Sequence, residues 1–121
     1  MVRPAAAIAE IFSAWEAGDA ARAAAVFAEP DGVYEDPLLL APLRGRDQIE
    51  TGLAAAMAEL RDCRIATRAL VERGDLGLVE AEFRSELVEG GRLDFEFAMA
   101  VELRAGEVLR LTEYFDTGPL R

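Results

Sequence analysis

The sequence predicts an α+β fold in which three helices from the N-terminal half cover one face of a cone-shaped, curved antiparallel sheet. Before Asp62 the larger apolar residues recur every three or four positions, as on one face of a helix. Beyond Asp62 they alternate with charged residues, as in a strand with one solvated face. The 121 residues, 52% of them hydrophobic, fit a single domain spanning residues 1–121.

The first two predicted helices form a hairpin at the N-terminus. Residues 3–17 predict a helix because their larger apolar side chains form one stripe, and Gly18 follows as a stop. This stripe consists of Ile8, Ile11, Phe12 and Trp15. Asp19 can then cap a second, alanine-rich helix over residues 20–28, which Pro30 ends.

A short strand and a third helix follow. Residues 33–35 predict a strand that stops at Pro37, since proline has no amide hydrogen for a sheet ladder, and residues 38–42 form an apolar loop. The third helix opens at Gly45, and apolar residues recur along it at helical spacing. These residues are Ile49, Leu53, Met57 and Leu60.

Four longer strands, paired mostly as hairpins, complete the chain. We expect them at residues 63–72, 79–87, 92–104 and 107–116, with a tight turn at Gly90-Gly91. Three helices cover only part of such a sheet, so its inner face is expected to enclose a cavity for a small hydrophobic molecule. The candidate substrate-binding residues are Trp15, Met57, Phe95, Phe97, Met99 and Phe115. Trp15 lies on a helical stripe, where a core role is the alternative.

Glu113 is the first candidate for chemistry. Alternation places it on the same strand face as Leu109, Leu111 and Phe115. If that face looks into the cavity, desolvation raises the pKa of the carboxyl and lets it exchange a proton near neutral pH. The alternative is a position at the sheet end where Glu113 reaches water.

Tyr34 and Asp36 are the other two candidate catalytic residues. They lie two positions apart in the short strand and therefore project to the same side. A phenol and a carboxyl could meet one substrate there. The alternative for Asp36 is that its side chain caps a nearby amide at the end of the strand.

Composition excludes several classes of function. With 13 Lys plus Arg against 23 Asp plus Glu, the formal net charge is -10, which disfavours nucleic acid and anionic membranes as partners. The chain has no His, so imidazole triads and His-containing zinc sites are excluded. Cys63 is the only thiol and is expected to be a packing residue.

We also expect neither a cofactor nor a metal. The sequence has no glycine-rich phosphate loop, EF-hand loop or serine nucleophile elbow. It has no signal-peptide pattern and no stretch of about 20 apolar residues, so a cytoplasmic location is expected.

Three segments, in this order and spacing, resemble a known family. They are residues 12–19 (FSAWEAGD), residues 34–37 (YEDP) with 45–49 (GRDQI), and residues 106–116 from GEV to EYFD. Together they resemble the SnoaL-like branch of the nuclear transport factor 2-like superfamily, which includes ketosteroid isomerase, limonene-epoxide hydrolase and polyketide cyclases. The resemblance implies a homodimer formed through the outer face of the sheet, where Ala98 and Ala100 are expected.

The resemblance also assigns residues to roles. Asp36 matches the proton-shuttling aspartate of the isomerase, whose two oxyanion donors fall on Ile11 and on Ala98 or Phe97. Against the epoxide hydrolase, Glu113 takes the place of a catalytic aspartate, Tyr34 matches a water-orienting tyrosine, and Asp36 stands at an asparagine. The remaining Arg and Asp of the hydrolase fall on Phe83 and Ser85. The histidine that many cyclases use has no counterpart in this chain.

Two functions follow from these residues. The leading prediction is a cofactor-independent acid–base enzyme, an isomerase, cyclase or hydrolase, in which Asp36 and Glu113 transfer protons and Tyr34 supplies a hydrogen bond. The alternative is a non-catalytic domain for small-ligand binding or dimerisation, which the missing oxyanion donors favour. An open cavity that holds both carboxyls would favour chemistry, and a cavity closed by aromatic side chains would favour the alternative.

Overall fold

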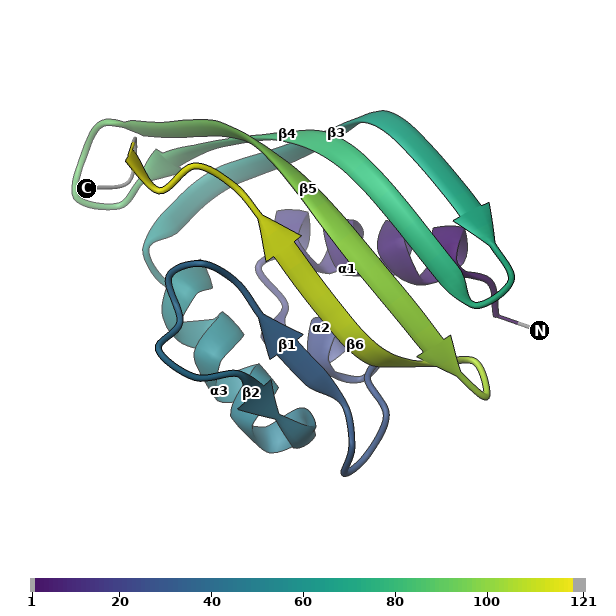
Figure 1. Cartoon of the computed structure of the whole chain (residues 1–121). Helices are drawn as coiled ribbons and strands as arrows, with labels where there is room; N and C mark the ends of the chain where they lie inside the picture. Colours follow the sequence, from purple (N-terminus) through teal and green to yellow (C-terminus); the bar gives the residue numbers. More distant parts are fainter. Residues whose placement is uncertain (1, 119–121) are drawn as a thin grey trace.

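The computed structural model describes residues 2–118 as three helices against one six-stranded sheet (Figure 1). The elements are α1 (Pro4–Ala17), α2 (Ala20–Ala24), β1 (Val33–Glu35), β2 (Leu43–Arg44), α3 (Gly45–Met57), β3 (Leu60–Arg73), β4 (Leu76–Leu87), β5 (Arg92–Arg104) and β6 (Glu107–Tyr114). The strand order is β2-β1-β6-β5-β4-β3. All three helices lie on one side of a sheet that bends around them, which confirms the predicted α+β class and the curved sheet (Figure 1).

The sheet is mixed, because one of its pairings is parallel. β3 through β6 pair antiparallel as successive hairpins, as predicted. β1 instead runs parallel to β6, with Tyr34 opposite Leu111, so the expectation of a wholly antiparallel sheet needs this correction. A three-residue strand has no feature in its own sequence that fixes the direction of its partner. β2, which pairs with β1, is two residues long and shows no period that could predict it.

The apolar stripe of α1 forms the centre of the core. Ile8 and Ile11 are 1% and 2% exposed, and Gly18 ends the helix in the left-handed conformation at φ 68°. Gly77 of β4 faces the start of α1, where an added Cβ would lie 2.6 Å from the Cβ of Pro4. Glycine at this position therefore lets the helix and the sheet approach each other closely.

Two predicted helix ends are wrong. α2 stops at Ala24 because the next residues join β6: the Ala28 amide donates to the Val108 carbonyl (2.8 Å), and the Val108 amide donates to the Val26 carbonyl (2.9 Å). Sheet pairing thus replaces the expected last turn. α3 ends at Met57, and Leu60 opens β3 opposite Leu87 rather than closing the helix.

A bulge in β6 changes which residues face the core. Glu102 of β5 pairs with Arg110 while Leu103 pairs with Val108, so Leu109 has no opposite residue. Val108 and Leu111 are both 0% exposed. The prediction that Leu109 faces inward is therefore wrong for this end of the strand, whereas Glu113 beyond the bulge keeps its predicted inward direction. β6 also ends at Tyr114, two residues earlier than expected.

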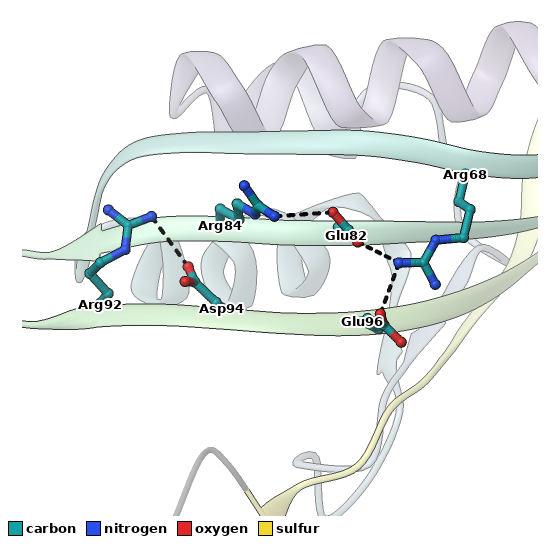
Figure 2. Close-up of polar contacts among 6 residues, drawn as sticks. All are labelled: Arg68, Glu82, Arg84, Arg92, Asp94 and Glu96. Carbon is teal, nitrogen blue, oxygen red and sulfur yellow. Dashed lines mark hydrogen bonds and ion pairs between the residues drawn. The ribbon is translucent and has the colours of Figure 1, made fainter.

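The outer face of the sheet carries charged side chains at one end and an apolar patch at the other. Arg68 bridges Glu82 and Glu96 across three strands, and Arg92 pairs with Asp94 on β5 (Figure 2). We use the name outer apolar patch for Val71, Leu78, Ala98, Ala100 and Tyr114, which line a shallow hollow on this face. Val71, Leu78 and Tyr114 are 63%, 47% and 57% exposed.

Candidate active site

A cavity of about 210 Å³ lies inside the cone. Its walls come from α1, β1 and the loop after it, the end of α3, and strands β3 to β6. The lining residues are Ile11, Phe12, Trp15, Tyr34, Asp36, Leu38, Ala56, Glu59, Leu60, Ile65, Phe83, Leu87, Leu93, Phe95, Phe97, Glu113 and Phe115. Exposed Leu38 and Glu59 mark the mouth, and Tyr34, 4% exposed, lies in the interior.

Aromatic rings in mutual contact build much of the wall. Phe83 and Phe95 are directly opposite in the β4–β5 register, and their rings stack with centroids 4.9 Å apart. Phe95 also contacts Phe115 at 5.1 Å, and Trp15 meets Phe83 edge to face at 6.2 Å. Because each ring is held by another, the cavity is largely pre-formed. Its volume is below the roughly 300–1,000 Å³ of drug-sized sites, so it suits a small molecule.

Glu113 and Tyr34 form a hydrogen-bonded pair in this apolar surrounding. The parallel β1–β6 pairing puts Tyr34 beside Leu111, one inward position before Glu113. The Tyr34 hydroxyl donates to Glu113 Oε1 at 3.0 Å. The pairing of two strands that are far apart in sequence therefore assembles the phenol and the carboxyl.

The surroundings of Glu113 raise its pKa to about 7. Removal from water is the largest cause, the hydrogen bond from Tyr34 opposes it, and the charge of Asp36 adds to it. The pKa of Tyr34 is raised well above its ordinary value, chiefly by burial and then by the charges of Glu113 and Asp36. Glu113 can thus give or take a proton near neutral pH, while Tyr34 stays a hydrogen-bond donor.

Asp36 caps backbone amides after β1 and also lies in the cavity wall. Its Oδ1 accepts the amide hydrogens of Leu38 (2.7 Å) and Leu39 (3.2 Å), which is the capping arrangement expected where a strand ends before proline. The residue also lines the cavity together with Tyr34 and Glu113. The two amides fix the orientation of a second carboxyl at the site.

The structure brings together most of the predicted site residues. Besides Tyr34, Asp36 and Glu113, the cavity wall contains Trp15, Phe95, Phe97 and Phe115. Met57 and Met99 are corrections, because both lie in the core and outside the lining. Met99 is opposite Glu113 in the β5–β6 register, but at 1% exposure it is buried in the core. Alternation gives the face of a residue, not how far along the strand the cavity extends.

Several lining residues were not predicted. Ile11 and Phe12 lie on the apolar stripe of α1, and Phe83 lies on the inner face of β4. The helical and strand periods therefore indicate that all three side chains face inward. Glu59 lies in the turn between α3 and β3. No period or motif in the sequence marks it as part of the mouth.

At the positions that the family resemblance matches to donors, no side chain offers a donor to the cavity. Ile11, Phe83 and Phe97 line the cavity, and none of them has a polar side-chain atom. Ser85 is 1% exposed and donates its hydroxyl to the Arg61 carbonyl at 3.0 Å, outside the lining. Ala98 belongs to the outer apolar patch. The polar side chains available to a bound molecule are therefore those of Tyr34, Asp36, Glu59 and Glu113, together with the indole N–H of Trp15.

The remaining candidate groups lie away from this site. Cys63 is buried, and burial, followed by the charge of Glu16, raises its pKa to about 11, so the thiol stays protonated. Within residues 2–118, no three acidic or cysteine side chains are grouped so that they could hold a metal ion. In the same part of the chain, every helix is too short or too polar to cross a bilayer.

Solved structures with the same fold include proteins of several descriptions. An NTF2-like protein of unknown function from Burkholderia pseudomallei matches with a TM-score of 0.85 and 20% identity over 99% of this chain and 95% of that one. A hypothetical protein with a ketosteroid isomerase-like fold from Catenulispora acidiphila, in complex with trimethylamine, gives 0.83 and 21% over 95% and 88%. An LEH-like epoxide hydrolase from M. tuberculosis gives 0.76 and 20% over 92% and 80%.

These identities establish the fold and not the reaction. No curated protein matches the sequence significantly. Residues 8–111 match the SnoaL-like domain, and this span contains all three helices from Ile8 onward and the sheet through Leu111. The chain therefore belongs to the SnoaL-like domain family.

Proposed function

We propose that this protein is a cofactor-independent acid–base enzyme that isomerises, cyclises or hydrates a small hydrophobic molecule in the cone. The observation that carries the proposal is Glu113, a carboxyl with a pKa of about 7 that is hydrogen-bonded to Tyr34 inside an aromatic cavity. Burying a carboxyl among aromatic side chains is costly, and function is a common reason for retaining one.

The proposed chemistry is a proton transfer with no change in oxidation state. Ionised Glu113 removes a proton from a substrate carbon or from a water molecule, and the resulting carboxylic acid returns it to another substrate atom. Tyr34 donates to Glu113 Oε1 and orients the carboxyl. Asp36, held by two backbone amides, is the second carboxyl for the opposite transfer. The negative charge of Asp36 also helps to raise the pKa of Glu113.

Two structural neighbours support a small-molecule site in this fold. One is in complex with trimethylamine, and another is an LEH-like epoxide hydrolase. The exposed residues Leu38 and Glu59 at the cavity mouth and the two carboxyls in its wall further support the proposed chemistry.

The second candidate is a binding domain without a reaction. It is favoured by Ile11, Phe83 and Phe97, which are apolar at the positions where related enzymes have donors. Without such donors, an enolate or epoxide oxygen loses its main stabilisation. In this case the cavity would retain a ligand, but Glu113 would exchange no proton with it.

One experiment separates the two functions. The molecule retained by the purified protein is identified by native mass spectrometry and then incubated in D₂O with the wild type, Glu113→Gln or Glu86→Gln. We expect deuterium incorporation or turnover with the wild type and a loss of about 10²–10⁴-fold in Glu113→Gln, the usual contribution of a general acid or base. Glu86 is an exposed carboxyl on β4, and its variant should match the wild type. A retained molecule that all three proteins leave unchanged would support the binding domain.

We also propose that the protein is a homodimer formed through the outer apolar patch. Leu78 and Val71 face each other across β3 and β4 and are about half exposed, and Ala98 and Ala100 next to them leave room for a partner surface. An exposed apolar patch rimmed by charged residues is typical of an interface.

A further inference from the structure

We propose that the cavity selects small organic cations over neutral and anionic molecules of the same shape. The inference deepens the proposed function and rests on it, because it names the class of ligand for the same cavity. The ligand would place a positively charged nitrogen between the carboxyls and the aromatic rings, with its apolar substituents against the wall.

All charged side chains that line the cavity are negative. They are those of the acidic residues Asp36, Glu59 and Glu113, and no Lys or Arg occurs among the described lining residues. The uncharged polar groups are the Tyr34 hydroxyl and the indole N–H of Trp15. Arg61, next in sequence to Leu60 of the wall, donates instead to the Val88 carbonyl at 3.4 Å. An anionic substituent would therefore enter a negatively charged cavity without a counter-charge.

The aromatic rings of the cavity wall favour a cation independently of the carboxyls. Trp15, Phe83, Phe95 and Phe115 surround the same space in a connected set of ring contacts. The negative face of an aromatic ring attracts an alkylated ammonium group, and quaternary ammonium ions are recognised in proteins by such aromatic walls. A neutral molecule of the same shape gains the apolar contacts but not this attraction.

A bound cation should also change the protonation of Glu113. The titratable groups that share the cavity with it are Tyr34 on β1, Asp36 in the loop after β1, and Glu59 after α3. The side chains that α1 and strands β3 to β5 contribute to the wall are not titratable. A cation beside Glu113 supplies the missing counter-charge and stabilises the ionised form. Binding should therefore release a proton, and affinity should rise as the pH passes through 7.

The test uses three molecules that differ in charge and share one shape. Isothermal titration calorimetry measures the affinity of the folded protein for choline, its neutral isostere 3,3-dimethylbutan-1-ol and the anion 3,3-dimethylbutanoate at pH 6, 7 and 8. We expect choline to bind most tightly and the anion most weakly. We also expect choline affinity to rise about tenfold from pH 6 to pH 8, as ionisation of one carboxyl with a pKa near 7 allows.

Two variants assign the effect to the cavity. Glu113→Gln should remove the rise with pH, and Glu86→Gln, a matched change on the outer side of β4, should keep it. Circular dichroism checks that both are folded. The inference is overturned if the neutral alcohol or the anion binds at least as tightly as choline at pH 8, or if Glu113→Gln keeps the pH dependence.

The outcomes also separate this inference from the proposed function. Binding of the alcohol alone would reject the cationic ligand class and leave the acid–base site intact. Binding of none of the three probes would also reject the inference, and the acid–base proposal would then depend on the separate titration of Glu113.

Discussion

Three influences set the pKa of Glu113, and substitutions can remove the two that come from neighbouring side chains. Burial holds the proton on the carboxyl, the Tyr34 hydroxyl favours the ionised form, and the charge of Asp36 disfavours it. Together these three influences give Glu113 a pKa of about 7. This balance makes the individual contributions measurable.

Substitutions at the two neighbours should move the pKa of Glu113 in opposite directions. Tyr34→Phe deletes the hydrogen bond that lowers the pKa, so the midpoint should rise above about 7. Asp36→Asn deletes a negative charge, so the midpoint should fall. Side-chain ¹³C NMR of the glutamate carboxyls as a function of pH measures both. Shifts of the same sign in the two variants would reject the described arrangement.

Glu113 should also make the folded state less stable as the pH rises. Its pKa is about 7 in the folded protein against an ordinary 4.5, so between these values the folded state binds more protons than the unfolded state. The free energy of unfolding should therefore decrease from about pH 4.5 to 7 through this group. Glu113→Gln should lack this contribution. Between pH 4.5 and pH 8, its free energy of unfolding measured in urea should therefore rise relative to that of the wild type by on the order of 3 kcal/mol. An identical pH dependence in Glu86→Gln and Glu113→Gln would contradict the assignment.

The helices and strands differ in how well periodicity predicted them. The long elements were predicted because a stripe or an alternation repeats over many residues, as in α1 with Ile8 and Ile11 or in β5 with Phe95 and Phe97. The parallel β1–β6 pairing, the short β2 and the early end of α2 depend on contacts between distant segments. Local periodicity does not contain that information.

The same distinction explains which site residues were predicted. Tyr34, Asp36 and Glu113 follow from alternation and from the family resemblance, because each lies on a strand or at its end. Met57 and Met99 lie in the core and outside the cavity lining, because the period shows the inward face of an element and not the boundary between core and cavity. Glu59 lies in a turn, where alternation has no meaning.

Contact between α1 and β4 should depend on the absence of a side chain at Gly77. In Gly77→Ala the new methyl group would lie 2.6 Å from Pro4 Cβ and 3.3 Å from Ile8 Cδ1, so the helix must move away from the sheet. We expect a loss of about 1–3 kcal/mol in the free energy of unfolding, as for other overpacked cores. Glu86→Ala, at an exposed position on the same strand, should stay within about 0.5 kcal/mol of the wild type. A Gly77→Ala variant as stable as Glu86→Ala would show that the helix packs less closely than described.

The two faces of the sheet carry different features. The concave side of the sheet holds the cavity and its carboxyls, while the convex side carries the ion pairs of Figure 2 and the outer apolar patch. A partner chain on the convex side would leave the mouth at Leu38 and Glu59 open. Dimerisation and ligand binding are therefore expected to be independent.

Oligomeric state should respond to charge placed in the outer apolar patch. Val71→Glu with Leu78→Glu puts two carboxyls on the proposed interface, so light scattering should give twice the mass of the chain for the wild type and the mass of a single chain for the double variant. Val88→Glu is the control, because Val88 is 50% exposed in the β4–β5 turn, outside the patch. A monomeric wild type would refute the proposed dimer.

The proposed acid–base site is tested most directly by titrating Glu113 in the wild-type protein. Side-chain ¹³C NMR follows the titration, and Glu113→Gln assigns the signal. We expect the titration of Glu113 to have its midpoint near pH 7, since desolvation by the cavity wall outweighs the hydrogen bond from Tyr34. A midpoint near the ordinary 4.5 would mean that water reaches the carboxyl freely. That result would contradict the claim that the cone holds an acid–base group ready for proton transfer at neutral pH.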